Sequence, residues 1–141
     1  MSADRPRIFI DENLPHQLAP ALGKAFRRAI FSSHAAERLS GTLDLPLFAE
    51  LSSREFNVLI TKDLAQLAKA EERDGIRNAD LHWVGVREPD SAKGIDFYGA
   101  LLSALAATVP AVIKGIASPP HAYYVHCEHL QWNPPIRSER I

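Results

Sequence analysis

The chain has 141 residues, of which 46% are hydrophobic and 23% charged, and this composition predicts one globular domain and excludes a disordered chain. Sixteen Lys and Arg side chains against seventeen Asp and Glu give a formal net charge of −1, so bulk positive charge cannot hold this protein on a nucleic acid. A single cysteine, Cys127, excludes an intrachain disulfide, and no signal-peptide pattern opens the sequence. Both features predict a cytoplasmic protein. The longest weakly polar run, residues 101–113, falls short of the roughly 20 residues of a membrane span, so no membrane contact is expected.

The first third of the chain predicts two strands and two helices. Residues 7–11 are β-branched and aromatic and predict a buried strand, and residues 29–31 predict a second. Between them, Asn13 fits a helix N-cap and Pro15 fits the first helical turn. Apolar side chains then recur at helical spacing, at Leu14, Leu18, Ala21, Leu22 and Ala25. After a Ser-Gly-Thr break, Asp44 can cap a further helix.

The remainder of the chain continues the alternation of strands and helices. Residues 56–61 form the clearest strand pattern, and a polar helix is expected over residues 65–73. A fourth strand is expected at 81–86 and a fifth at 122–126. Between these two strands, residues 95–117 predict one long helix, bent or split near its internal proline.

Strands that alternate with helices predict an α/β fold. We expect a single three-layer domain with a mainly parallel central sheet and helices on both faces. Its core should cover about residues 7–130, followed by an irregular tail over residues 131–141. In such sheets, ligands bind beyond the carboxyl ends of the strands, so these ends are where a functional site is expected.

Three aspartates fall at that edge of the predicted sheet. Asp11 ends the first strand, Asp44 opens the helix after the second, and Asp63 follows the third strand by two residues. Each pair of carboxylates at 4 Å repels by about 4 kcal/mol at an effective dielectric constant of 20, which favours a bound cation. Oxygen ligands at a strand edge suit Mg²⁺ or Mn²⁺. The same residues also fit a purely structural interpretation, in which Asp44, Asp63 and Asn13 only cap helices.

Three motifs, in their order and spacing, carry a resemblance to a known family. They are Ile8-Phe-Ile-Asp-Glu-Asn-Leu-Pro15, Gly41-Thr-Leu-Asp44 and Val58-Leu-Ile-Thr-Lys-Asp63. Together they resemble the PIN-like nuclease superfamily, and within it the PIN-like domains of VapC-type toxins, over about residues 7–130. The resemblance implies a Mg²⁺- or Mn²⁺-dependent endoribonuclease that cleaves single-stranded RNA through a metal-activated water. It also implies the toxin of a toxin–antitoxin pair, with a cognate antitoxin as protein partner and a homodimer as a further expectation.

The resemblance assigns roles to individual residues. Asp11, Asp44 and Asp63 would be the metal-binding carboxylates. Thr61 would position the Asp63 loop or a metal-bound water through its hydroxyl, and Asn13 would add an oxygen contact.

The sequence departs from the family pattern at one place. Many relatives have a further acid soon after the Thr-x-Asp segment, where this chain has Ala65 and Gln66. Asp74 and Asp80 are candidate substitutes, although each also fits a solvated loop residue. The departure keeps an alternative open, a catalytically degenerate PIN-like module that binds RNA or a protein partner.

Cations close to the acids would contact the RNA backbone. The candidates are Lys62, Lys69 and Arg73, with Arg77 on the same segment, and each also fits an ordinary solvated charge. A third class of protein, the phosphoacceptor receiver, shares the acidic first strand. Its strand-end aspartate in mid-chain and its late Lys-Pro are both missing here.

Overall fold

Five strands form a parallel sheet in the computed structural model, which describes residues 5–88, 94–127 and 137–140. They are β1 (Arg7–Ile10), β2 (Ile30–Ser33), β3 (Val58–Thr61), β4 (His82–Arg87) and β5 (Ala122–His126). Their order in the sheet is β2-β1-β3-β4-β5, and every neighbouring pair is parallel. The predicted α/β fold with a parallel sheet is confirmed. Of the predicted tail over 131–141, only residues 137–140 are described, and the rest lies outside the described residues.

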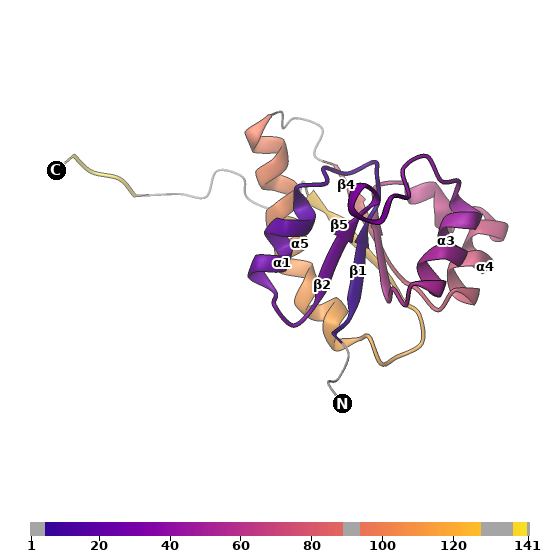
Figure 1. Cartoon of the computed structure of the whole chain (residues 1–141). Coiled ribbons are helices and arrows are strands. Elements are labelled where there is room, and N and C mark those ends of the chain that lie inside the picture. The colour runs from indigo at the N-terminus through magenta and orange to yellow at the C-terminus, as the bar shows by residue number, and fades with distance from the viewer. Residues whose placement is uncertain (1–4, 89–93, 128–136, 141) are drawn as a thin grey trace.

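Helical segments connect the strands in the described part of the chain. They are α1 (Leu18–Ala25), α2 (His34–Glu37), α3 (Asp44–Ser53), the 3₁₀ helix η1 (Leu64–Leu67), α4 (Ala70–Asn78) and α5 (Ile95–Lys114). Successive strand residues point to opposite faces of a sheet, and β1 shows the result. Ile8 and Ile10 join a buried cluster with residues of α1 and α5, whereas Phe9 joins a second cluster with residues of α3 and α4. Figure 1 shows these helix pairs on opposite sides of the sheet.

The chain reverses its direction of travel across the sheet between β1 and β3. From β1 it goes through α1 to β2 at one edge, then returns through α3 to β3 on the other side of β1. This order is that of a flavodoxin-like doubly wound sheet, and its reversal point opens a crevice at the carboxyl ends of the two central strands. The fold therefore favours a ligand site beyond Ile10 of β1 and Thr61 of β3.

One predicted helix is wrong in detail, and one short helix was not predicted. The helix expected over 65–73 is divided into η1 and α4, and α4 continues to Asn78. The short helix α2 was not predicted, because four residues are too few to show a helical period.

The predicted helix caps are also wrong at two positions. Asn13 does not cap α1, which begins at Leu18 after Gln17 and has no side-chain cap. Asp44 is the first residue of α3, and Leu43 occupies the cap position. An acidic residue in the first turn still interacts favourably with the helix dipole.

Helix α5 runs continuously through Pro110 for 20 residues, so the helix predicted over 95–117 is not split at this proline, and it ends at Lys114. By length and composition alone it could cross a bilayer, and it is the one such helix among the described residues. Here its buried face lies against the sheet, through Ala100, Leu101, Ala104, Leu105, Val109 and Val112. Core helices meet the same criterion.

Candidate functional site

Asp11 and Thr61 join the ends of the two central strands. Asp11 follows β1 directly, and its backbone N–H donates to the Ile60 carbonyl at 2.9 Å. The Thr61 hydroxyl, at the end of β3, donates to Oδ2 of Asp11 at 2.8 Å, and the Glu12 backbone N–H donates to Oδ1 at 2.8 Å. Both side chains are buried. The Asp11 carboxyl is therefore fixed at the reversal point of the sheet.

The Thr61 hydroxyl is the centre of a small hydrogen-bond network. It accepts from Nδ2 of Asn13 at 3.0 Å and from the Asp63 backbone N–H at 3.1 Å. Oδ1 of Asn13 accepts from the Lys62 backbone N–H at 3.2 Å. Asn13 thus ties the loop after β1 to the loop after β3. Asp63 accepts from the Ala65 N–H at 3.1 Å, so the structural interpretation, a cap for the next helix, is correct for this residue.

Glu12 positions the loop that carries Asp44. Its two carboxylate oxygens accept from the Gly41 backbone N–H at 3.0 and 3.2 Å. Gly41 has a φ of +78°, a conformation in which glycine is favoured because it has no Cβ. Three residues later the chain enters α3, whose first residue, Asp44, interacts electrostatically with Asp11.

Glu72 joins this group from α4. Its carboxyl lies against that of Asp44 and also interacts electrostatically with Asp63. The side chain is half-buried and its nearest cation is Nζ of Lys69 at 3.8 Å from Oε2. Four acidic residues from four segments therefore converge on this edge: Asp11, Asp44, Asp63 and Glu72. We call this group the acidic edge.

The acidic edge disfavours full ionisation. Burial raises the pKa of Asp11 above its ordinary value of 3.8, and the charges of Asp44 and Glu12 add to this rise, whereas the hydrogen bonds from Thr61 and from the Glu12 amide oppose it. The Asp44 carboxyl raises the pKa of Glu72 through a hydrogen bond, which two carboxyl groups can form only when one of them is protonated. The site thus has an excess of negative charge.

The donor set of the acidic edge fits a hard divalent cation. Its groups are all carboxylates, the ligands that Mg²⁺ and Mn²⁺ prefer. Oε2 of Glu72 is buried and receives no hydrogen bond from a donor, which is costly for an acceptor oxygen. In the described parts of the chain, no three His, Cys, Asp or Glu residues are close enough together to hold a metal ion as they stand. Binding would therefore require the carboxyl groups to move toward a common centre.

A groove opens beside two of these acids, between the start of α3 and the start of α4. It has a volume of about 520 Å³. Its lining combines apolar and charged residues: Thr42, Leu43, Asp44, Leu45, Pro46, Lys69, Glu71 and Glu72. Leu43 is largely exposed on its rim. The groove therefore borders the acidic edge at Asp44 and Glu72.

The three cations predicted to contact RNA lie in three different environments. Lys62 forms an ion pair with Glu88, with Nζ to Oε1 at 2.6 Å. Lys69 lines the groove. Arg73 lies outside it and lines a separate cavity beside Arg77.

Glu72 is an acid of this edge that the sequence did not predict. Asp74 pairs with Arg77 on the exposed surface of α4, and Asp80 precedes β4 at the opposite edge of the sheet. Neither joins the acidic edge. Glu72 lies in α4, which begins at Ala70 after the separate helix η1, and its carboxyl interacts with that of Asp44 on α3.

Comparison with known proteins finds no matching family model, no similar curated protein and no similar solved structure.

Proposed function

We propose that this protein is a Mg²⁺- or Mn²⁺-dependent endoribonuclease of the PIN-like type. One observation supports this most directly: the acidic edge gathers carboxylates whose pKa values rise for Asp11 and Glu72, beside a buried Glu72 oxygen without a donor. A fold has little reason to bring such groups together unless a cation binds them. The position at the reversal point of a doubly wound sheet adds weight to a binding role.

Asp11, Asp44 and Glu72 would hold the ion, with Asp63 close by. A bound Mg²⁺ or Mn²⁺ would neutralise these carboxylates and supply Lewis-acid activation of a phosphodiester and of water. Thr61 and the Glu12 amide fix the Asp11 carboxyl, and Glu12 fixes the turn before Asp44. These contacts fix the Asp11 carboxyl and the turn before Asp44, so the movement that metal binding requires would fall to the Asp44 and Glu72 side chains.

The substrate would be single-stranded RNA in the groove beside Asp44 and Glu72. Its backbone phosphates would meet Lys69, and its bases would contact the apolar rim at Leu43 and Leu45. In this proposal the protein is a cytoplasmic toxin restrained by a cognate antitoxin.

The test compares metal binding and RNA cleavage in matched variants. Asp11→Asn and Glu72→Gln remove one charge each from the acidic edge, and Asp80→Asn removes a charge at the opposite edge of the sheet. Mn²⁺ should raise the unfolding temperature of the wild type and of Asp80→Asn, and much less that of the other two. Cleavage of a mixed-sequence RNA should follow the same order. Undiminished cleavage by Asp11→Asn would refute the assignment.

One observation favours a second candidate, a PIN-like module that binds RNA or a protein without cleaving it. Within the described residues no three potential metal ligands are already close together, and the Asp44 carboxyl lies against Glu72 and raises its pKa. For such a module we expect RNA or antitoxin binding that is unchanged by Mn²⁺ and no turnover with any divalent ion.

The strand order agrees with the phosphoacceptor receiver alternative, but the residues at the strand ends do not. Receivers use the same doubly wound order, yet the residue at the end of β3 is Thr61, whose hydroxyl is engaged with Asp11. The late lysine, Lys114, ends α5 and precedes the start of β5, so it lies away from the carboxyl ends of the strands.

A further inference from the structure

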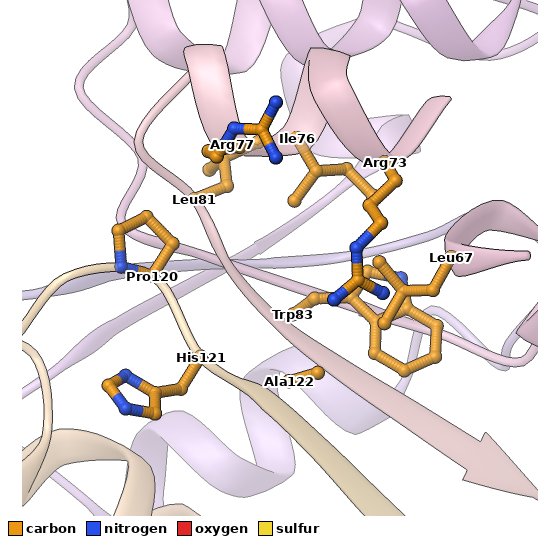
Figure 2. A pocket seen from close by; sticks show the side chains of 9 residues that line it. All are labelled: Leu67, Arg73, Ile76, Arg77, Leu81, Trp83, Pro120, His121 and Ala122. Carbon is orange, nitrogen blue, oxygen red and sulfur yellow. The ribbon is translucent and has the colours of Figure 1, made fainter. Parts of the chain in front are cut away.

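A second cavity lies on the α3–α4 side of the sheet, away from the groove. Helices α3 and α4 contribute with β1, β3 and β4 to the buried cluster of this side, and no residue of β5 belongs to that cluster. Ala122 and Tyr124 of β5 are consequently exposed, Tyr124 by 59%. The cavity occupies the notch between α4 and the first residues of β4 and β5, with a volume of about 110 Å³ (Figure 2).

This cavity is lined by apolar side chains and by basic side chains. The apolar lining comes from Leu67, Ile76, Leu81, Trp83 and Pro120, and the polar groups on its rim are Arg73, Arg77 and His121. Figure 2 shows the Arg73 side chain extending from α4 toward Trp83, with His121 across the cavity. Arg77 forms an ion pair with Asp74. Among the described residues, no ion pair or side-chain hydrogen bond engages Arg73, so its charge is available to a ligand.

The floor of the cavity is held rigid. Nε1 of Trp83 donates to Oε1 of the buried Gln66 at 3.1 Å, which fixes the indole ring. Tyr124 meets this ring edge-on, with centroids 5.4 Å apart. An exposed tyrosine ring supported by a buried tryptophan offers a preformed surface on which a planar base can stack.

We infer that this cavity binds one phosphate of a single-stranded oligoribonucleotide, with the neighbouring base stacked on Tyr124. At about 110 Å³ the cavity is small, which suits a single phosphate group better than a whole nucleoside. A guanidinium without a partner matches a phosphate through paired N–H donors.

Helix α4 connects this cavity with the acidic edge. Glu72 and Arg73 are consecutive, and consecutive helical residues point in directions about 100° apart. Glu72 thereby faces Asp44, while Arg73 faces the cavity. This inference rests on the proposed function only in taking the bound RNA to be the RNA that is cleaved. The cavity would hold that RNA at a point away from the scissile bond.

Binding is measured without divalent metal, so that cleavage cannot contribute. The chain has two tryptophans, and Trp132→Phe leaves Trp83 as the reporter. In EDTA, an eight-residue oligoadenylate should quench Trp83 fluorescence. Arg73→Gln and Tyr124→Ala should each weaken binding about fivefold or more. Arg28→Gln removes an equally exposed arginine from the far edge of the sheet, before β2, and should leave affinity within twofold.

The outcomes separate this inference from the proposed nuclease. Equal affinity of Arg73→Gln and Arg28→Gln for the oligonucleotide would overturn the cavity assignment, even if the wild type cleaves RNA. Loss of affinity in Arg73→Gln but not in Arg28→Gln would support it, even if no metal produces cleavage. A third binding measurement uses adenosine monophosphate in place of the oligonucleotide. If it binds as tightly as the oligomer, the ligand is a free nucleotide and the inference about a strand is wrong.

Discussion

The Thr61 hydroxyl donates to the Asp11 carboxylate at 2.8 Å, and this contact joins the ends of two strands that are 50 residues apart in sequence. A carboxylate that is buried beside other acids needs such a donor, because its desolvation is otherwise uncompensated. The same hydroxyl receives N–H groups from Asn13 and Asp63. Thr61 therefore links the structure of the candidate site to the stability of the sheet.

Replacing Thr61 with valine should destabilise the protein by about 1–3 kcal/mol, since the buried Asp11 carboxyl loses a donor and two N–H groups lose their acceptor. Urea denaturation at neutral pH measures this loss. Thr61→Ser keeps the hydroxyl and should retain most of the stability. If valine and serine were equally tolerated, the hydroxyl would have no role in holding the two strand ends.

Stability should depend on pH through Asp11. Burial raises the pKa of Asp11 above 3.8 in the folded state, so the folded protein holds more protons than the unfolded chain between the ordinary and the raised value. The free energy of unfolding must then decrease as pH rises through that interval. Asp11→Asn lacks this contribution and should show a shallower decrease in urea denaturation between pH 3.5 and 7. Asp80→Asn should follow the wild type, and a steeper decrease in Asp11→Asn would contradict the prediction.

Two glycines should respond oppositely to alanine. A Cβ at Gly85 of β4 would overlap the ring of the buried Trp83 and lie 2.8 Å from Leu64. We expect Gly85→Ala to cost about 1–3 kcal/mol and to change the Trp83 fluorescence. Gly99 lies in α5 with open space around its missing Cβ, so Gly99→Ala should stabilise the protein by about 0.5–1 kcal/mol. Thermal unfolding of both variants tests the packing of the two sides of the sheet.

Lys62 should matter less for RNA binding than Arg73, because Glu88 already neutralises it. Lys62→Gln is expected to change the affinity for a single-stranded oligonucleotide less than twofold. Glu88→Gln releases the lysine and should strengthen binding, with a steeper dependence on salt. A titration series in NaCl gives both quantities. An equal loss of affinity in Lys62→Gln and Arg73→Gln would show that the Glu88 pair opens in the complex.

The strands and the sheet edge were predictable from the sequence, because both depend on local patterns. The fifth strand has the predicted bounds, Ala122–His126, and the parallel sheet brings Asp11 and Asp63 to one edge as expected. The N-cap predicted for Asn13 was wrong, because a cap is assigned from local sequence alone, whereas this amide contacts Thr61, 48 residues away. Glu72 was missed for a related reason. Its contact with Asp44 is made between α3 and α4, which are separate elements, and the polar sequence around Glu72 has no apolar periodicity that would predict such a contact.

The central position of β1 has a consequence for synthesis on the ribosome. Residues 7–72 include β1, β2 and β3, which are neighbours in the sheet, and all four acids of the acidic edge. These three strands can therefore pair before the rest of the chain is made. Ile8 and Ile10, however, share their buried cluster with Leu101 and Leu105 of α5, which follow by roughly 90 residues. Counted from the end of β3 at Thr61, the nascent sheet presents an uncovered apolar surface for about 2–9 seconds, at about 5–20 residues per second. During that interval, a chaperone can bind the surface that α5 later covers.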